Sequence, residues 1–236
     1  KLKALQTPET FNTMASKSSN ESIVTMTASK DAVAGTYRIE VEQLATNTSY
    51  ISGTISLENG DITKELGITT GKFTIINADG ESKDINVEAS DSLRSIVEKI
   101  NEAAKDKTSE DGETVKGTGI NATIIDGRLV LTDSETGHRN ITLNGYGNGT
   151  LTRLGLNVAS RDENIGLNSK FNINGINIES KTNTITDAVL GLTINLNKEH
   201  AVGEYDTITV SSDTERLVKA VQDFVDQYNS TMSFIE

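Results

Sequence analysis

The sequence has no cysteine, no tryptophan and a single proline. Without cysteine, the chain cannot form a disulfide bond, a thiolate metal site or a cysteine nucleophile. Aromatic residues make up only 4% of the composition, so the side chains that most often anchor tight interfaces or stack on bases and sugars are scarce. The composition therefore excludes disulfide-stapled scaffolds and all thiol chemistry.

Positive charge is also scarce, because 22 Lys and Arg face 34 Asp and Glu, which gives a net charge of −12. Such a surface repels the phosphates of nucleic acids and of anionic lipids. No apolar run reaches the roughly 18 residues of a membrane-spanning helix, and no stretch resembles a cleaved signal peptide. We expect neither a nucleic-acid partner nor membrane insertion.

The length of 236 residues predicts one or two domains with room for a real core. The chain begins with Lys1 instead of Met and ends at Glu236 inside an expected helix. We interpret it as a fragment of a longer protein.

Alternating apolar residues predict strands through the centre of the chain. Residues 23–28 and 37–41 alternate in this way, and the turn residues between them favour one antiparallel pair. A second pair is expected between 192–196 and 208–210, and a hairpin within 73–87.

Two further hairpins have a predictable register. A two-residue turn at Asp126-Gly127 places Ile124 opposite Leu129 and Ala122 opposite Leu131. A turn at Asn174-Gly175 likewise sets three pairs, and a slip by one residue would bury asparagines. These pairs are Phe171 with Ile178, Asn172 with Asn177, and Ile173 with Ile176.

Apolar residues recur at helical spacing in the middle of the sequence and at both of its ends. From Leu93, apolar residues recur at helical intervals after an expected N-cap at Ser90 or Asp91. The last helix is expected to open at the capping-box pattern of residues 212–215. Its apolar stripe, a candidate packing or interface surface, consists of Leu217, Val221, Phe224, Val225 and Tyr228. A weaker helical face near the start of the chain consists of Leu2, Leu5, Phe11 and Met14.

Catalytic and metal-binding patterns are missing. The only imidazoles, His138 and His200, lie in polar segments and are expected to be exposed loop residues. Carboxylate pairs such as Asp133 with Glu135 are what an acidic surface supplies by chance, and no calcium-loop pattern occurs. We expect no enzyme activity, no cofactor and no metal, and hence a structural or binding module.

Three stretches then give a family resemblance. Residues 32–45 (AVAGTYRIEVEQLA) resemble the N-terminal region of the flagellar filament-cap family, also called hook-associated protein 2 or FliD. Residues 89–137, from ASDSL to LVLTDSETG, resemble the IN motif of flagellins and hook-associated proteins. The third comprises FNING at 171–175, NTITDAVLGLTINL at 183–196 and FVDQYN at 224–229, and it resembles the start of the C-terminal region of the family.

The resemblance implies a nested α+β organisation that is mainly β. A helical leg domain would be formed by residues 1–21 and 212–236, and a β-rich head domain by 22–47 and 163–211. A second head domain with the IN motif and one helix, residues 48–162, would be inserted into the first. The terminal coiled-coil segments of the family are missing from this sequence.

The resemblance also implies a function. It predicts a homo-oligomeric ring that caps the distal end of the bacterial flagellar filament and promotes folding and insertion of flagellin. Implied partners are flagellin, hook-filament junction proteins and an export chaperone, with extracellular location after export through the flagellar type III apparatus. Alternatives are an adhesin or carbohydrate-binding module that uses the head loops on host glycans, or another hook-filament junction protein or flagellin.

Overall fold

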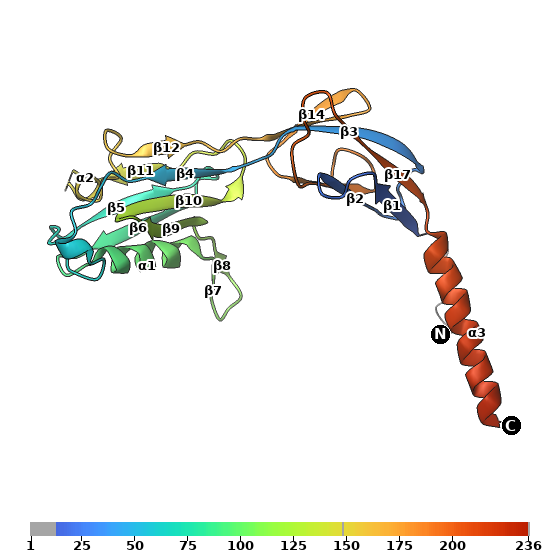
Figure 1. Cartoon of the computed structure of the whole chain (residues 1–236). Helices are drawn as coiled ribbons and strands as arrows, with labels where there is room; N and C mark the ends of the chain where they lie inside the picture. Colours follow the sequence, from blue (N-terminus) through green and yellow to red (C-terminus); the bar gives the residue numbers. More distant parts are fainter. Residues whose placement is uncertain (1–12, 148, 236) are drawn as a thin grey trace. The chain divides into compact units, whose positions relative to one another are not determined.

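The computed structural model of the chain describes residues 13–147 and 149–235. The chain forms two compact units, which Figure 1 colours along the sequence. The two-segment unit combines the residues up to Leu44 with those from Ser169 onward, and the inserted unit is Ala45–Asn168. The expected fold class, α+β and mainly β, is confirmed.

Two antiparallel sheets build the two-segment unit. The larger has the strand order β1, β17, β3, β13, β14, and the smaller has the order β15, β16, β2. Both sheets combine strands from before and after the insertion, so neither segment can form this unit without the other. The strands are β1 Met14–Ser18, β2 Val24–Ala28, β3 Gly35–Gln43, β13 Ser169–Ile173, β14 Ile176–Ser180, β15 Thr184–Ile185, β16 Leu192–Leu196 and β17 Asp206–Ser212.

Alternation along these strands creates the core of the two-segment unit. Ile39 and Val41 on β3 are fully buried, whereas Glu42, the next residue of the same strand, is exposed. Apolar residues of both sheets form one cluster, as in a sandwich whose inner faces meet. The unit ends in helix α3, Thr214–Ile235, drawn in red in Figure 1.

The inserted unit contains two main sheets, the helix α1 and the short helix α2. The sheet orders are β12, β4, β10, β9 and β11, β5, β6, while β7 and β8 form a small exposed hairpin. Its elements are β4 Asn47–Ile51, the 3-10 turn η3 Glu58–Gly60, β5 Gly71–Ile76, β6 Ser82–Val87, α1 Leu93–Ala104, β7 Lys107–Thr108, β8 Thr114–Val115, β9 Ile120–Ile125, β10 Arg128–Thr136, β11 Thr142–Gly145, α2 Thr150–Arg153 and β12 Asp162–Asn164. Helix α1 packs on β6 and β9 and buries Leu93, Ile96 and Ile100 in the core.

The hairpin registers expected from the sequence are confirmed. Ile124 pairs with Leu129 across the turn at Asp126-Gly127, and Ala122 pairs with Leu131. All three expected pairs of the β13–β14 hairpin are present. Both turns have positive φ at their two central residues, which Asn, Asp and Gly tolerate best.

Two expected strand pairs are wrong. Residues 23–28 and 37–41 do not pair with each other, because β2 pairs with β16 and β3 lies between β17 and β13. Likewise β16 and β17 lie in different sheets. Each expected pair consisted of strands that follow one another in the sequence. In the structure, the chain instead crosses from one sheet to the other between these strands, and the core lies between the two sheets.

Two helix details also differ from expectation. The N-cap of α1 is Ser92, whose hydroxyl accepts the Ser95 N–H while Ser95 Oγ accepts the Ser92 N–H. Met14, expected on a helical face, begins strand β1, because its segment finds a ladder partner in β17. Leu2, Leu5 and Phe11 lie outside the described residues.

The boundaries between the two compact units lie at Leu44/Ala45 and Asn168/Ser169. The sequence places the corresponding boundaries at 47/48 and 162/163. A separate leg domain that includes α3 stays a prediction.

Candidate interaction surface

His200 is not the exposed loop residue that the sequence suggests. Its side chain is only 2% exposed, and its ring contacts the edge of strand β3. The Val41 N–H donates to Nδ1 at 2.9 Å, so Nε2 carries the proton and faces Asp206 Oδ2 at 3.1 Å. The His200 N–H also donates to the Val41 carbonyl. The imidazole thus replaces a strand partner along part of β3.

The cluster around His200 does not have the geometry of a hydrolytic triad. Ser19 Oγ donates to Asp206 Oδ1 at 2.6 Å, so the carboxylate lies between the hydroxyl and the imidazole. A serine nucleophile needs the imidazole in that middle position. Because both His200 nitrogens are already bonded within the fold, the group has no free site for a substrate proton. His138 is exposed, as expected.

Buried charges in the inserted unit are paired within the fold. Arg139 Nε donates to Asp133 Oδ2 at 2.8 Å, with side chains 8% and 1% exposed. Asp91 accepts hydrogen bonds from Lys99, Ser95 and the Glu88 N–H. Burial acts to raise the pKa of Asp91, but these hydrogen bonds outweigh it and the pKa is lowered. These charged groups are thus bonded to partners within the fold and stabilise it.

In the part of the chain that the structure describes, no group of three or more His, Asp or Glu side chains is arranged to hold a metal ion. No helix among those residues is both long and apolar enough to span a bilayer.

Several exposed apolar side chains lie on helix α3. Asp213 caps the helix, because its Oδ1 accepts the Arg216 N–H at 2.9 Å, one residue later than the expected Ser212 cap. Of the expected stripe, Val221, Val225 and Tyr228 are 46–56% exposed and Phe224 is half-buried. The side chain of Leu217 lies outside the described residues.

The structure adds two members to this stripe. Val218 is 61% exposed and Met232 is 42% exposed, and both lie on α3. Together with the expected residues they give a 3-4-3-4 spacing, which is the a/d pattern of a coiled coil. The members of this heptad stripe are Val218, Val221, Val225, Tyr228 and Met232. This spacing is present in the sequence, but the expected stripe, which starts at Leu217, omits Val218 and Met232.

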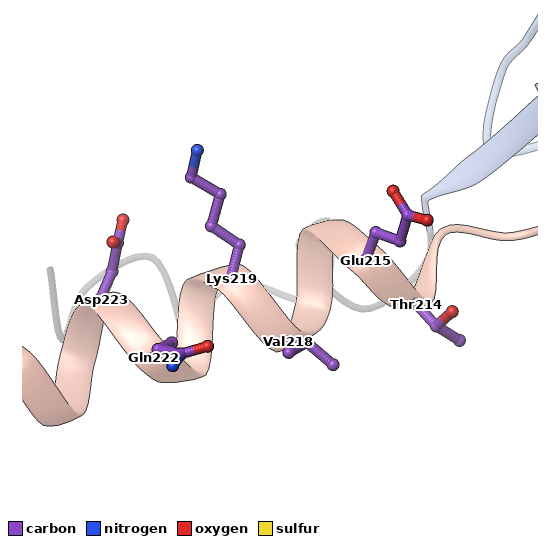
Figure 2. Close-up of a pocket in the computed structure, with 6 residues that line it drawn as sticks. All are labelled: Thr214, Glu215, Val218, Lys219, Gln222 and Asp223. Atoms are coloured by element: carbon purple, nitrogen blue, oxygen red, sulfur yellow. The ribbon is translucent and has the colours of Figure 1, made fainter.

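A hollow of about 450 Å³ lies beside the first turns of α3. In the described part of the chain, its lining is Thr214, Glu215, Val218, Lys219, Gln222 and Asp223. Figure 2 shows Glu215, Lys219 and Asp223 on one side of the helix and Val218 on another. The heptad stripe is therefore bordered by charged residues, as coiled-coil seams are.

The start of α3 lies beside the start of strand β1. Strand β1 pairs antiparallel with β17, and the Asp213 N–H donates to the Thr13 carbonyl at 2.9 Å. The residue that precedes α3 is thus bonded to the residue that precedes β1. The start of β1 and the start of α3 therefore lie at the same end of the sheet.

Comparison with known proteins identifies the family. The model of the N-terminal region of flagellar hook-associated protein 2 matches residues 1–48, and the model of its C-terminal region matches residues 166–236. The flagellin hook IN motif matches residues 72–135. The first two models cover the segments of the two-segment unit, and the IN motif falls within the inserted unit.

Individual relatives agree with this result. The chain is 31% identical to the A-type flagellar hook-associated protein 2 of Pseudomonas aeruginosa over 97% of its own length and 49% of that protein. It is 31% identical to the Xenorhabdus nematophila flagellar hook-associated protein 2, over 93% of this chain and 50% of that protein. The chain thus spans about half the length of these curated relatives.

The fold is similar to that of a solved flagellar cap protein. A crystal structure of three domains of FliD from Escherichia coli superposes with a TM-score of 0.74 and 25% identity, covering 98% of this chain and 76% of that one. The two family models, the relatives and this superposition agree from one end of the sequence to the other. The chain belongs to the flagellar hook-associated protein 2 (FliD) family.

Proposed function

We propose that this chain is part of a homo-oligomeric cap at the distal end of a bacterial flagellar filament, where it promotes folding and insertion of flagellin. The family match and the resemblance to a solved flagellar cap protein support this role. The observation that carries this proposal is the exposed heptad stripe of α3. An exposed row of apolar residues at heptad spacing is typical of a helix that packs on another helix.

Within this proposal, α3 and the segment before Thr13 form the leg of the cap. The hydrogen bond between Asp213 and Thr13 supports it, because it holds the start of β1 beside the start of α3. The β-rich parts of both units would form the plate of the ring. Flagellin, hook-filament junction proteins and an export chaperone are the partners of this proposal, and the flagellar type III apparatus is its export route.

The test is deletion of the gene in its own bacterium. We expect short or missing filaments and monomeric flagellin in the medium, both restored by the wild-type gene. Normal filament length after deletion would contradict the cap role. Light scattering of the purified gene product should show a ring-sized oligomer, and a monomer at all concentrations would contradict the homo-oligomeric ring.

The stripe is tested by complementation with Val225→Asp. A buried carboxylate at an a position disrupts helix packing, so filament elongation should fail although the β-rich units remain folded by circular dichroism. Gln227→Glu is the matched control, because it also adds one negative charge to α3 but lies off the stripe. Equal filament lengths in the two strains would show that the stripe has no part in capping.

A further inference from the structure

Asparagine followed by glycine undergoes a reaction that needs no enzyme. The deprotonated backbone nitrogen of the glycine attacks Asn Cγ, the new N–C bond closes a succinimide ring, and ammonia leaves. Water then adds to either ring carbonyl and opens the ring to aspartate or isoaspartate. No oxidation occurs, and each event adds one negative charge. Glycine favours the attack because it has no side chain to obstruct it.

The chain contains four such pairs, at Asn59, Asn144, Asn148 and Asn174. Asn148 lies outside the described residues. The other three occupy different environments, and the reaction requires that Cγ and the next backbone nitrogen move freely toward each other. Hydrogen bonds to either group therefore slow it.

The pair at Asn174 is held on both sides. Asn174 Oδ1 accepts the Arg38 N–H at 2.9 Å, and the Asn174 N–H donates to the Arg38 carbonyl at 3.0 Å. The N–H of Gly175, which carries the attacking nitrogen, donates to Asn172 Oδ1 at 2.7 Å. Both reacting groups are thus fixed by partners in the same sheet.

The pair at Asn144 is held by its strand. Asn144 and Gly145 lie in β11 and pair with Thr74 and Phe73 on β5. A Cβ on Gly145 would meet the Leu151 side chain at 3.1 Å, so this backbone is closely packed. Rotation toward Cγ would break the ladder between β11 and β5.

The pair at Asn59 is open. Asn59 and Gly60 are both exposed in the 3-10 turn η3, and a Cβ on Gly60 would meet no atom within 4 Å. The Gly60 N–H has only a long hydrogen bond of 3.3 Å to the Leu57 carbonyl. Among the described residues, the Asn59 side-chain amide has no hydrogen-bond partner. Neither reacting group is fixed.

We propose that Asn59 is a modification site at which the folded chain converts asparagine to aspartate and isoaspartate, and that the fold keeps Asn174 and Asn144 unreactive. The new carboxylate lies between Glu58 and Asp61 in an exposed turn. Isoaspartate at this point adds a methylene to the backbone of the loop between β4 and β5. Aspartate and isoaspartate at position 59 thus accumulate in the folded protein with time, and each event adds one negative charge to the inserted unit.

The test compares the native chain with the same chain unfolded in urea. Both are incubated at mildly alkaline pH, digested, and analysed by mass spectrometry with electron-based fragmentation, which separates aspartate from isoaspartate. In the native chain, conversion at Asn59 should exceed that at Asn174 and at Asn144 by about thirtyfold, the factor that the loss of two hydrogen bonds corresponds to. In urea the rates at the three sites should be similar.

One variant pair tests the cause of the protection. Asn172→Ala removes the acceptor of the Gly175 N–H and should raise conversion at Asn174 several-fold with Asn59 unchanged. Asn172→Asp keeps an acceptor and should preserve the protection. Native conversion at Asn174 or Asn144 as fast as at Asn59 would overturn the proposal, and so would an unreactive Asn59. The comparison with urea needs no variant, so it decides the matter even if Asn172→Ala fails to fold.

Discussion

Removal of the Arg139 side chain should destabilise the inserted unit more than removal of any exposed cation. Arg139 is 8% exposed and its ion-pair partner Asp133 is 1% exposed, at a separation of 2.8 Å. In Arg139→Met, Asp133 Oδ1 still accepts the Glu135 N–H at 3.0 Å, but Oδ2 loses the guanidinium. The variant leaves a carboxylate buried without its cation, which costs more than the lost attraction itself.

The expected loss is about 3–5 kcal/mol of unfolding free energy, the range for breaking a buried ion pair from one side. Hydrogen bonds to Asp79 and then to Asp133 raise the pKa of Arg139, so the guanidinium is charged at every working pH. The Asp79 contact adds little to stability, because Asp79 is 60% exposed and solvent screens the pair. The cost therefore comes from Asp133.

Urea unfolding followed by circular dichroism measures the loss, and hydrogen exchange of β10 peptides locates it in the inserted unit. Lys105→Met is the matched control, because Lys105 and its partner Glu102 are 68% and 57% exposed, and it should cost about 1 kcal/mol at most. The double variant Arg139→Met/Asp133→Asn removes the stranded charge and should recover about 1–3 kcal/mol. An Arg139→Met variant within about 1 kcal/mol of wild type would refute the reasoning.

Three further predictions concern single contacts of the inserted unit. Because its folded pKa is lowered, Asp91 should stabilise the fold fully above its unfolded pKa of about 3.9 and lose this effect as the pH falls through the folded value. The stability difference between wild type and Asp91→Asn in urea titrations should therefore vanish at low pH, and a pH-independent difference would contradict it. Asn101→Ala should cost about 1–3 kcal/mol, because the Asn101 amide bonds both the N–H and the carbonyl of Ala122 at the edge of β9. Asn101→Asp, which keeps only acceptors, should not restore stability in the same assay. Gly166→Ala should cost about 1–3 kcal/mol in thermal unfolding, because its Cβ would lie 2.4 Å from two backbone carbonyl oxygens, and an unchanged melting temperature would contradict the packing.

Local features followed from the sequence. The turn at Asn174-Gly175 and the alternation of apolar residues on either side of it determined the β13–β14 register. All the paired residues lie within a few positions of that turn in the sequence. Helices α1 and α3 were also predicted from local spacing of apolar residues, although the N-cap of each lies one or two residues from its expected position. The family resemblance rested on order and spacing, which the sequence contains in full.

Only the tertiary structure decided which distant segments meet. Strand β2 pairs with β16, about 170 residues away in the chain, and no local pattern distinguishes that partner from its neighbour β3. His200 looked like a loop residue because its neighbours are polar, yet Val41, 159 residues earlier, lacks a ladder partner on that side and binds the imidazole instead. Periodicity determines which face of a strand is buried, but the partner of an open edge depends on how the whole sheet closes.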